Sequence, residues 1–129
     1  MTRFDAATPA DRESLTVAAI TAHRERESPF LTLETDSQDE PGPAPWVQFR
    51  QQEGQVNLDC TEAELDSIRA AIDGVGGVRV TEQHDVEDGG INLRIAVPGD
   101  DKRVAQVIET LFVDGFGLPA DYRLWVAAL

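Results

Sequence analysis

The sequence has little cysteine and no long apolar run, and each shortage excludes a class of protein. Cys60 is the only cysteine among 129 residues, so no disulfide can form within the chain and a reducing compartment is expected. No run of 18 apolar residues occurs, and the N-terminus does not resemble a secretory signal. These absences predict a cytoplasmic protein that does not enter a membrane.

Positive charge is also scarce. Ten arginines and one lysine stand against 24 acidic residues, which leaves a formal net charge of -13. Nucleic acids and anionic membranes would repel such a chain at long range, so we expect neither as a partner. A surplus of carboxylates with almost no lysine suggests either a high-GC genome or adaptation to a salty cytosol, and the acidic surplus is interpreted as a solvated surface.

The length fits one domain over residues 1–129. Residues 35–45 hold three prolines and three acids with nothing apolar enough to anchor them, which predicts a flexible loop inside that domain.

Three segments begin with helix-capping residues. Thr8, followed by Pro9, is typical of an N-cap, Thr61 begins a capping box, and Asp100 can cap a third helix. The first helix should fade in the charged run 23–27, the second should end at the glycines from 74, and the third near Gly115 or Gly117. The first helix is expected to face the core with Leu15, Ala18, Ala19 and Ala22, and with Val17 and Ile20 at the margins of that face.

Five segments predict strands, starting with the short stretch 30–34. Residues 46–50 and 55–60 alternate apolar and polar side chains around Gly54, which indicates a hairpin. A strand beginning at 78–80 and the alternating stretch 91–97 predict a second hairpin. Residues 122–126 fit either a last short strand or an apolar strap over the core.

The resulting order is α-β-β-β-α-β-β-α. Apolar residues point to one side of each strand, so the sheet should be antiparallel, with helices on one face and a more polar opposite face. The sequence therefore predicts a two-layer α+β fold with a sheet of about five strands.

This order resembles the type III secretion chaperone-like fold, in the branch that includes the YbjN-like proteins. The words that carry the resemblance are Pro45-Trp46-Val47-Gln48-Phe49, Gly54-Gln55-Val56-Asn57-Leu58, and a closing helix from Val104 that ends in Gly115-Phe116-Gly117-Leu118-Pro119. The resemblance implies a small, dimer-forming, non-enzymatic module that binds peptide segments of other proteins. The chain departs from that pattern in its proline-rich loop and its acidic surplus.

One group of polar and aromatic residues shares the polar face of the predicted sheet. Its arginines and tryptophan are common in recognition surfaces, and could hold the carboxylates and an apolar side chain of an extended acidic peptide. A solvated face whose arginines pair across strands with Asp59 or Glu82 is the alternative. The candidate binding residues are Trp46, Gln48, Arg50, Asn57, Arg79, Asn92 and Arg94.

Residues able to perform catalysis or bind metal are few. Cys60 is expected to be a small buried apolar group, and His84 beside Asp85 a solvated histidine near a turn. His23, His84 and Cys60 match no metal-binding spacing, so neither a metal nor another cofactor is predicted.

These observations favour a protein- or peptide-binding module, homodimeric by the resemblance. An acidic inhibitor that mimics nucleic acid is the alternative if the carboxylates gather on one ordered surface, and a small enzyme with an unrecognised site is the third.

The acidic surplus generates a first prediction. Because carboxylates repel one another in dilute buffer, molar salt should raise the melting temperature by screening that repulsion. Thermal unfolding followed by circular dichroism across salt concentrations measures this effect. A melting temperature that is flat from dilute buffer to molar salt would contradict the interpretation of the charge as an adaptation to salt.

Overall fold

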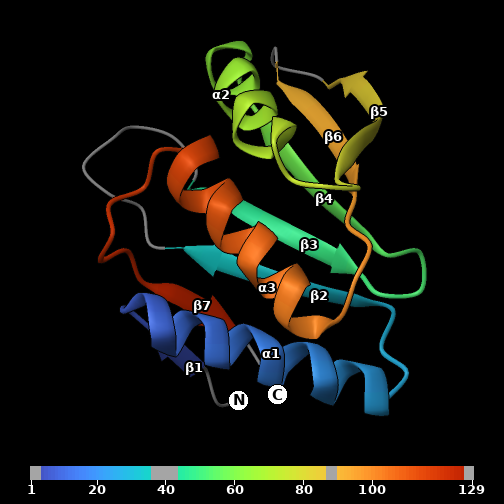
Figure 1. Cartoon of the computed structure of the whole chain (residues 1–129), viewed down its shortest axis with the longest axis vertical. Helices are drawn as coiled ribbons and strands as arrows, with labels where there is room; N and C mark the ends of the chain where they lie inside the picture. Colours follow the sequence, from blue (N-terminus) through green and yellow to red (C-terminus); the bar gives the residue numbers. More distant parts are fainter. Residues whose placement is uncertain (1–3, 36–43, 87–89, 127–129) are drawn as a thin grey trace.

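The computed structural model describes residues 4–35, 44–86 and 90–126, and these ranges form two layers (Figure 1). The elements follow one another as β1 (Phe4–Ala6), α1 (Pro9–Glu25), β2 (Phe30–Thr35), β3 (Trp46–Arg50), β4 (Gln55–Cys60), α2 (Glu62–Asp73), β5 (Arg79–Asp85), β6 (Ile91–Ala96), α3 (Asp101–Thr110), a π-helical turn η2 (Leu111–Gly115) and β7 (Leu124–Val126).

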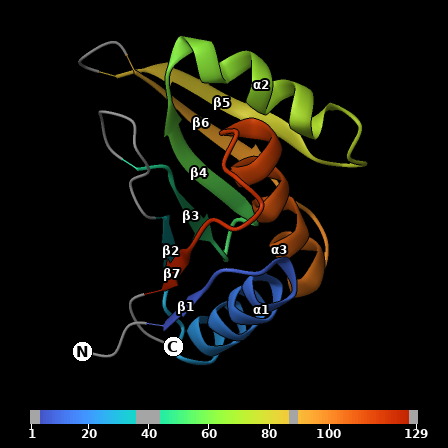
Figure 2. The same cartoon turned by 90° about the vertical axis from the view of Figure 1, so that its left-hand side faces the viewer.

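Within the described ranges the strands form one sheet in the order β1-β7-β2-β3-β4-β6-β5. Every neighbouring pair runs antiparallel. Figure 2 shows the sheet edge-on, with α1, α2 and α3 all on one side of it. The predicted α+β class, with helices on one face of an antiparallel sheet, is confirmed.

The strand count is a correction to the sequence prediction. The described sheet has seven strands rather than about five, because β1 and β7 add to the five predicted ones. Each has only three residues, too few for an alternating pattern to be recognised. β7 lies between β1 and β2, so residues 124–126 form a strand and not a strap.

The predicted helix starts are confirmed by hydrogen bonds. Thr8 Oγ1 accepts from the Asp11 N–H at 3.2 Å, and Pro9 occupies the first turn of α1. Thr61 and Glu64 form the reciprocal capping box of α2, and Asp100 accepts from the Arg103 N–H at the start of α3. These local bonds satisfy N–H groups that the helices cannot pair internally.

The buried face of α1 differs from the predicted one. Its buried residues are Arg12, Thr16, Ala19 and Ile20, whereas Ala18 is exposed. Arg12 is only 1 % exposed and donates two hydrogen bonds to Glu109, near the end of α3. The buried face of α1 therefore includes a charged residue, which apolar patterning does not assign to the core.

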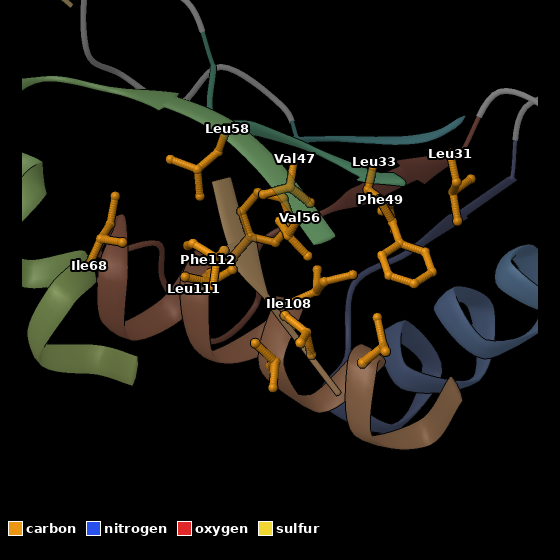
Figure 3. Close-up of a cluster of buried hydrophobic side chains, with 14 of the residues drawn as sticks. Leu31, Leu33, Val47, Phe49, Val56, Leu58, Ile68, Ile108, Leu111 and Phe112 are labelled. Carbon is orange, nitrogen blue, oxygen red and sulfur yellow. The ribbon is translucent and has the colours of Figure 1, made fainter. Parts of the chain in front are cut away.

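The core lies between the sheet and the helices. Figure 3 shows side chains of β2, β3 and β4 pointing toward α2, α3 and η2, and the labelled residues are all buried. Gly115 lets η2 approach α2, because a Cβ there would lie 3.0 Å from Ile68 Cγ1. In the first hairpin, Gly54 adopts φ +65°, as the tight turn between β3 and β4 requires.

The predicted loop 35–45 falls largely on residues 36–43, which lie outside the described residues. At its described ends, Thr35 Oγ1 donates a 2.7 Å hydrogen bond to the Pro45 carbonyl, which joins β2 to the start of β3.

In the described part of the chain, no helix combines the length and apolar character needed to cross a membrane.

The packing of β6 generates a second prediction. Leu93 is fully buried, so Leu93→Ala should reduce the free energy of unfolding by about 2 to 5 kcal/mol through lost transfer energy and a cavity. Thr32→Ala, an exposed change on the opposite face of the sheet, is the matched control and should cost less than about 1 kcal/mol. Urea denaturation measures both. Equal costs for the two variants would contradict the assignment of the strand faces.

Candidate functional site: the outer sheet face

The surface of the sheet turned away from the helices is here called the outer sheet face. Because side chains alternate along each strand, the register sets outward residues of neighbouring strands side by side in rows. Row 1 contains Phe30, Arg50, Gln55, Ala96 and Arg79. Row 2 contains Thr32, Gln48, Asn57, Arg94 and Glu82. Row 3 contains two registered sets, Asp5, Trp125, Glu34 and Trp46 on one side and Asp59, Asn92 and His84 on the other, because the pairing of β3 with β4 ends at Val47 and Leu58.

The seven residues predicted as a binding group all occupy this face, but in different rows. Trp46 and Asn92 lie in row 3, and Arg50 and Arg79 lie in row 1 on strands separated by β4 and β6. Gln48, Asn57 and Arg94 lie together in row 2. All seven residues therefore lie on the outer sheet face, but the three arginines do not converge on one point.

A β-bulge decides which side chains of β5 reach the outer face. The pairing of β5 with β6 shifts register between Val80 and Glu82. Arg79 before the bulge and Glu82 after it consequently point the same way, although they are three residues apart. Without the bulge, strict alternation would place Glu82 on the helical side.

Two of the three candidate arginines already have acidic partners. Arg94 Nη1 lies 3.1 Å from Glu82 Oε2, and Arg50 Nε lies 2.8 Å from Glu53 Oε2. The Arg50 guanidinium also stands 5.1 Å from the centre of the Phe30 ring. The ion pair between Arg94 of β6 and Glu82 of β5 crosses from strand to strand. It matches the alternative interpretation of the sequence, in which the arginines pair with acids on neighbouring strands.

The asparagines form a rigid polar link in the middle of the face. The Asn92 side-chain amide donates to Asn57 Oδ1 at 2.9 Å and to Asp59 Oδ1 at 2.8 Å. These bonds connect β4 with β6, so they orient the amides for one another and contribute to the sheet.

Row 3 contains residues that sequence reasoning missed. Trp125 of β7 and Glu34 of β2 stand opposite one another, and Glu34 stands opposite Trp46 of β3. Both tryptophans of the chain therefore lie in one row, on either side of a carboxylate. Trp125 was missed because the segment 122–126 has no clear period, and Glu34 because its strand ends at the loop.

An arginine of the chain itself sits at one end of row 3. Arg123, just before β7, forms an ion pair with Asp5 of β1. Its guanidinium lies 5.9 Å from the centre of the Trp125 ring. A cation thus contacts both a carboxylate and an indole of this row.

Charge is distributed unevenly between the outer sheet face and the rest of the described chain. The rows together with Arg123 hold four arginines and four carboxylates. The other described residues hold 15 acidic and six basic side chains. Among the described residues, the acidic surplus therefore lies on the helices, turns and sheet edge, and the outer sheet face is balanced overall.

The surroundings of the other potentially reactive side chains favour a role in the fold. Cys60 is buried, and this burial raises the pKa of its thiol to about 11. His84 is paired opposite Asn92 and Asp85 opposite Ile91, so the two side chains point to opposite faces of the sheet. Among the described residues, no three His, Cys, Asp or Glu side chains are placed to hold a metal ion.

A surface hollow of about 430 Å³ lies where α1 meets the start of α3. Asp101 in its wall accepts from Arg24 at 2.9 Å, and this hydrogen bond holds the pKa of the carboxyl below its ordinary value. The pair joins α1 to α3, so its role is to hold these two helices together.

Comparison with known proteins places the whole chain in one family. The chain belongs to the family of unknown function DUF7975, which matches residues 1–129. No curated protein and no solved structure matches it. Family membership therefore assigns no activity to the chain.

Proposed function

We propose that this member of DUF7975 is a non-enzymatic module that binds a segment of another protein on its outer sheet face. The observation that carries the proposal is row 3, where half-buried Trp46 on β3 and Trp125 on β7 flank Glu34 of β2, the strand between them. No helix of the described chain covers this face (Figure 2). Tryptophan is enriched among the residues that dominate binding energies in protein interfaces.

The charge distribution supports the same surface. A protein with a net charge of -13 repels most acidic cellular proteins at long range. On the outer sheet face the carboxylates are matched by arginines, so close approach of a partner meets less repulsion there than over the helices. The pairing of Arg50 and Arg94 with acids leaves fewer cations for an acidic ligand, so we assign the anchoring role to row 3.

Three further properties belong to the proposal. They are a cytoplasmic location, adaptation to high salt and a chaperone-like role. The resemblance to the type III secretion chaperone-like fold implies a homodimer, whose mass light scattering would measure.

Site-specific photo-crosslinking in the source cell tests the binding surface. A photoreactive residue at Gln48, in the centre of the outer sheet face, should capture a partner protein that mass spectrometry identifies. The same residue at Ser67, exposed on α2, is the control and should not capture that partner. Equal capture at the two positions, or none at Gln48, would contradict the proposal.

A further inference from the structure

We infer that the free edge of β5 pairs with the same edge of a second copy of this chain, so that two sheets join across a two-fold axis at His84. The inference rests on the homodimer of the proposed function and names its interface. Because strands that join edge to edge lie in the plane of the sheet, the outer sheet face stays open to its own partner.

The sheet of the described residues ends in two strands of unequal length. β1 has three residues, and such a short edge strand discourages pairing between proteins. β5 has seven residues and contains no proline. Figure 1 shows β5 at the end of the sheet, beside β6. The stretch 81–86 is exposed throughout. β5 therefore offers a long strand edge that no other described strand covers.

The hydrogen bonds between β5 and β6 show which main-chain groups of β5 point outward. The Val86 N–H donates to the Gly90 carbonyl at 3.0 Å, in line with the register of the two strands. Along antiparallel strands, residues that bond to their neighbour alternate with residues that do not. His84 therefore bonds to β6, whereas the N–H and C=O groups of Gln83 and Asp85 point away from it.

Beyond the bulge of β5, these two outward residues allow three two-fold pairings with a second copy. Gln83 opposite itself sets Asp85 against Thr81 at the bulge, where the ladder is irregular. Asp85 opposite itself brings two like charges together. Gln83 opposite Asp85 of the second copy pairs the outward groups of both residues and sets the two-fold axis at His84. This third register is the one that we propose.

Side chains on the helical side of β5 complement one another in this register. Arg69 of α2 donates to the side-chain oxygen of Gln83 and has no acidic partner among the described residues. Asp85 is exposed and has no cationic partner in the same part of the chain. The pairing sets Asp85 of each copy opposite Gln83 of the other, at the guanidinium of Arg69. Two charges that are unpaired in one chain are thereby paired in the dimer.

The outer side of the same strand adds an apolar contact. Val86 is 38 % exposed and, with Phe30, stands out among the large apolar side chains of the described residues. In the proposed register Val86 lies opposite Glu82 of the second copy, and the two His84 rings face one another. Pairing therefore covers an apolar side chain that a single chain leaves in water.

A cysteine at the two-fold axis tests the register directly. Opposed residues that do not bond to one another have Cα atoms about 4.5 Å apart, within the range of a disulfide. His84→Cys should therefore link two copies when oxidised glutathione takes up the two electrons. Non-reducing electrophoresis should show a band of twice the monomer mass, which dithiothreitol removes. Thr32→Cys, exposed on the interior strand β2, is the control and should form no such band.

Charge reversal tests the contact between Arg69 and Asp85. Asp85→Arg should weaken the dimer more than about tenfold, because it sets an arginine against Arg69 of the second copy. Glu25→Arg makes the same change in net charge on an exposed position of α1 and should not weaken it. The double variant Arg69→Asp, Asp85→Arg should restore the dimer. Sedimentation velocity measures all of them, with enough salt to screen the repulsion between two chains of charge -13.

The results that would overturn the inference differ from those that would reject the proposed function. A dimer without a disulfide in His84→Cys, or one that Asp85→Arg and Glu25→Arg affect equally, rejects this interface and keeps the homodimer. A pure chain that stays monomeric rejects both, and capture of another protein by a photoreactive residue at His84 would then assign the edge to a foreign strand. Binding on the outer sheet face is decided separately, by capture at Gln48.

Discussion

A buried arginine connects the helical layer to the last strand of the sheet. Arg12 is 1 % exposed and donates to both carboxylate oxygens of Glu109 at 2.9 and 2.6 Å. It also donates to the carbonyls of Tyr122 at 3.0 Å and Ala120 at 2.9 Å. The Tyr122 hydroxyl donates to Glu109 at 2.7 Å, and burial raises the pKa of that tyrosine. A buried charge is costly unless its bonds are satisfied, and here the hydrogen bond to Glu109 raises the pKa of Arg12.

The position of row 3 depends on this network. Residues 120–122 are held against α1 and α3, and β7 begins two residues later. The chain therefore enters the sheet between β1 and β2, which sets Trp125 opposite Glu34. With three residues, β7 has few ladder hydrogen bonds of its own, so the anchoring by Arg12 fixes where its tryptophan stands. The proposed binding surface is thus assembled from both ends of the described chain.

The sequence predicted the features that depend on interactions between residues close together in the chain. The capping residues Thr8, Thr61 and Asp100 and the alternation in 46–60 depend on neighbours in the chain, and both were confirmed. The buried face of α1 could not be predicted, since the partners of Arg12 lie 97 to 110 residues away. The candidate site was only partly predictable for the same reason. Alternation placed Trp46 and Arg94 on the outer face, whereas the pairing of Trp125 with Glu34 depends on where β7 enters the sheet.

Amide hydrogen exchange after substitution of Arg12 tests most directly whether this network positions β7. In Arg12→Met, the amides of β1 and β7 should exchange much faster while those of β3, β4 and β6 stay protected. Arg24→Met is the matched control, because it removes an ion pair between the same two helices that is exposed at Arg24, and it should leave β7 protected. Unchanged protection of β7 in Arg12→Met, or equal loss of protection in every strand, would contradict the account.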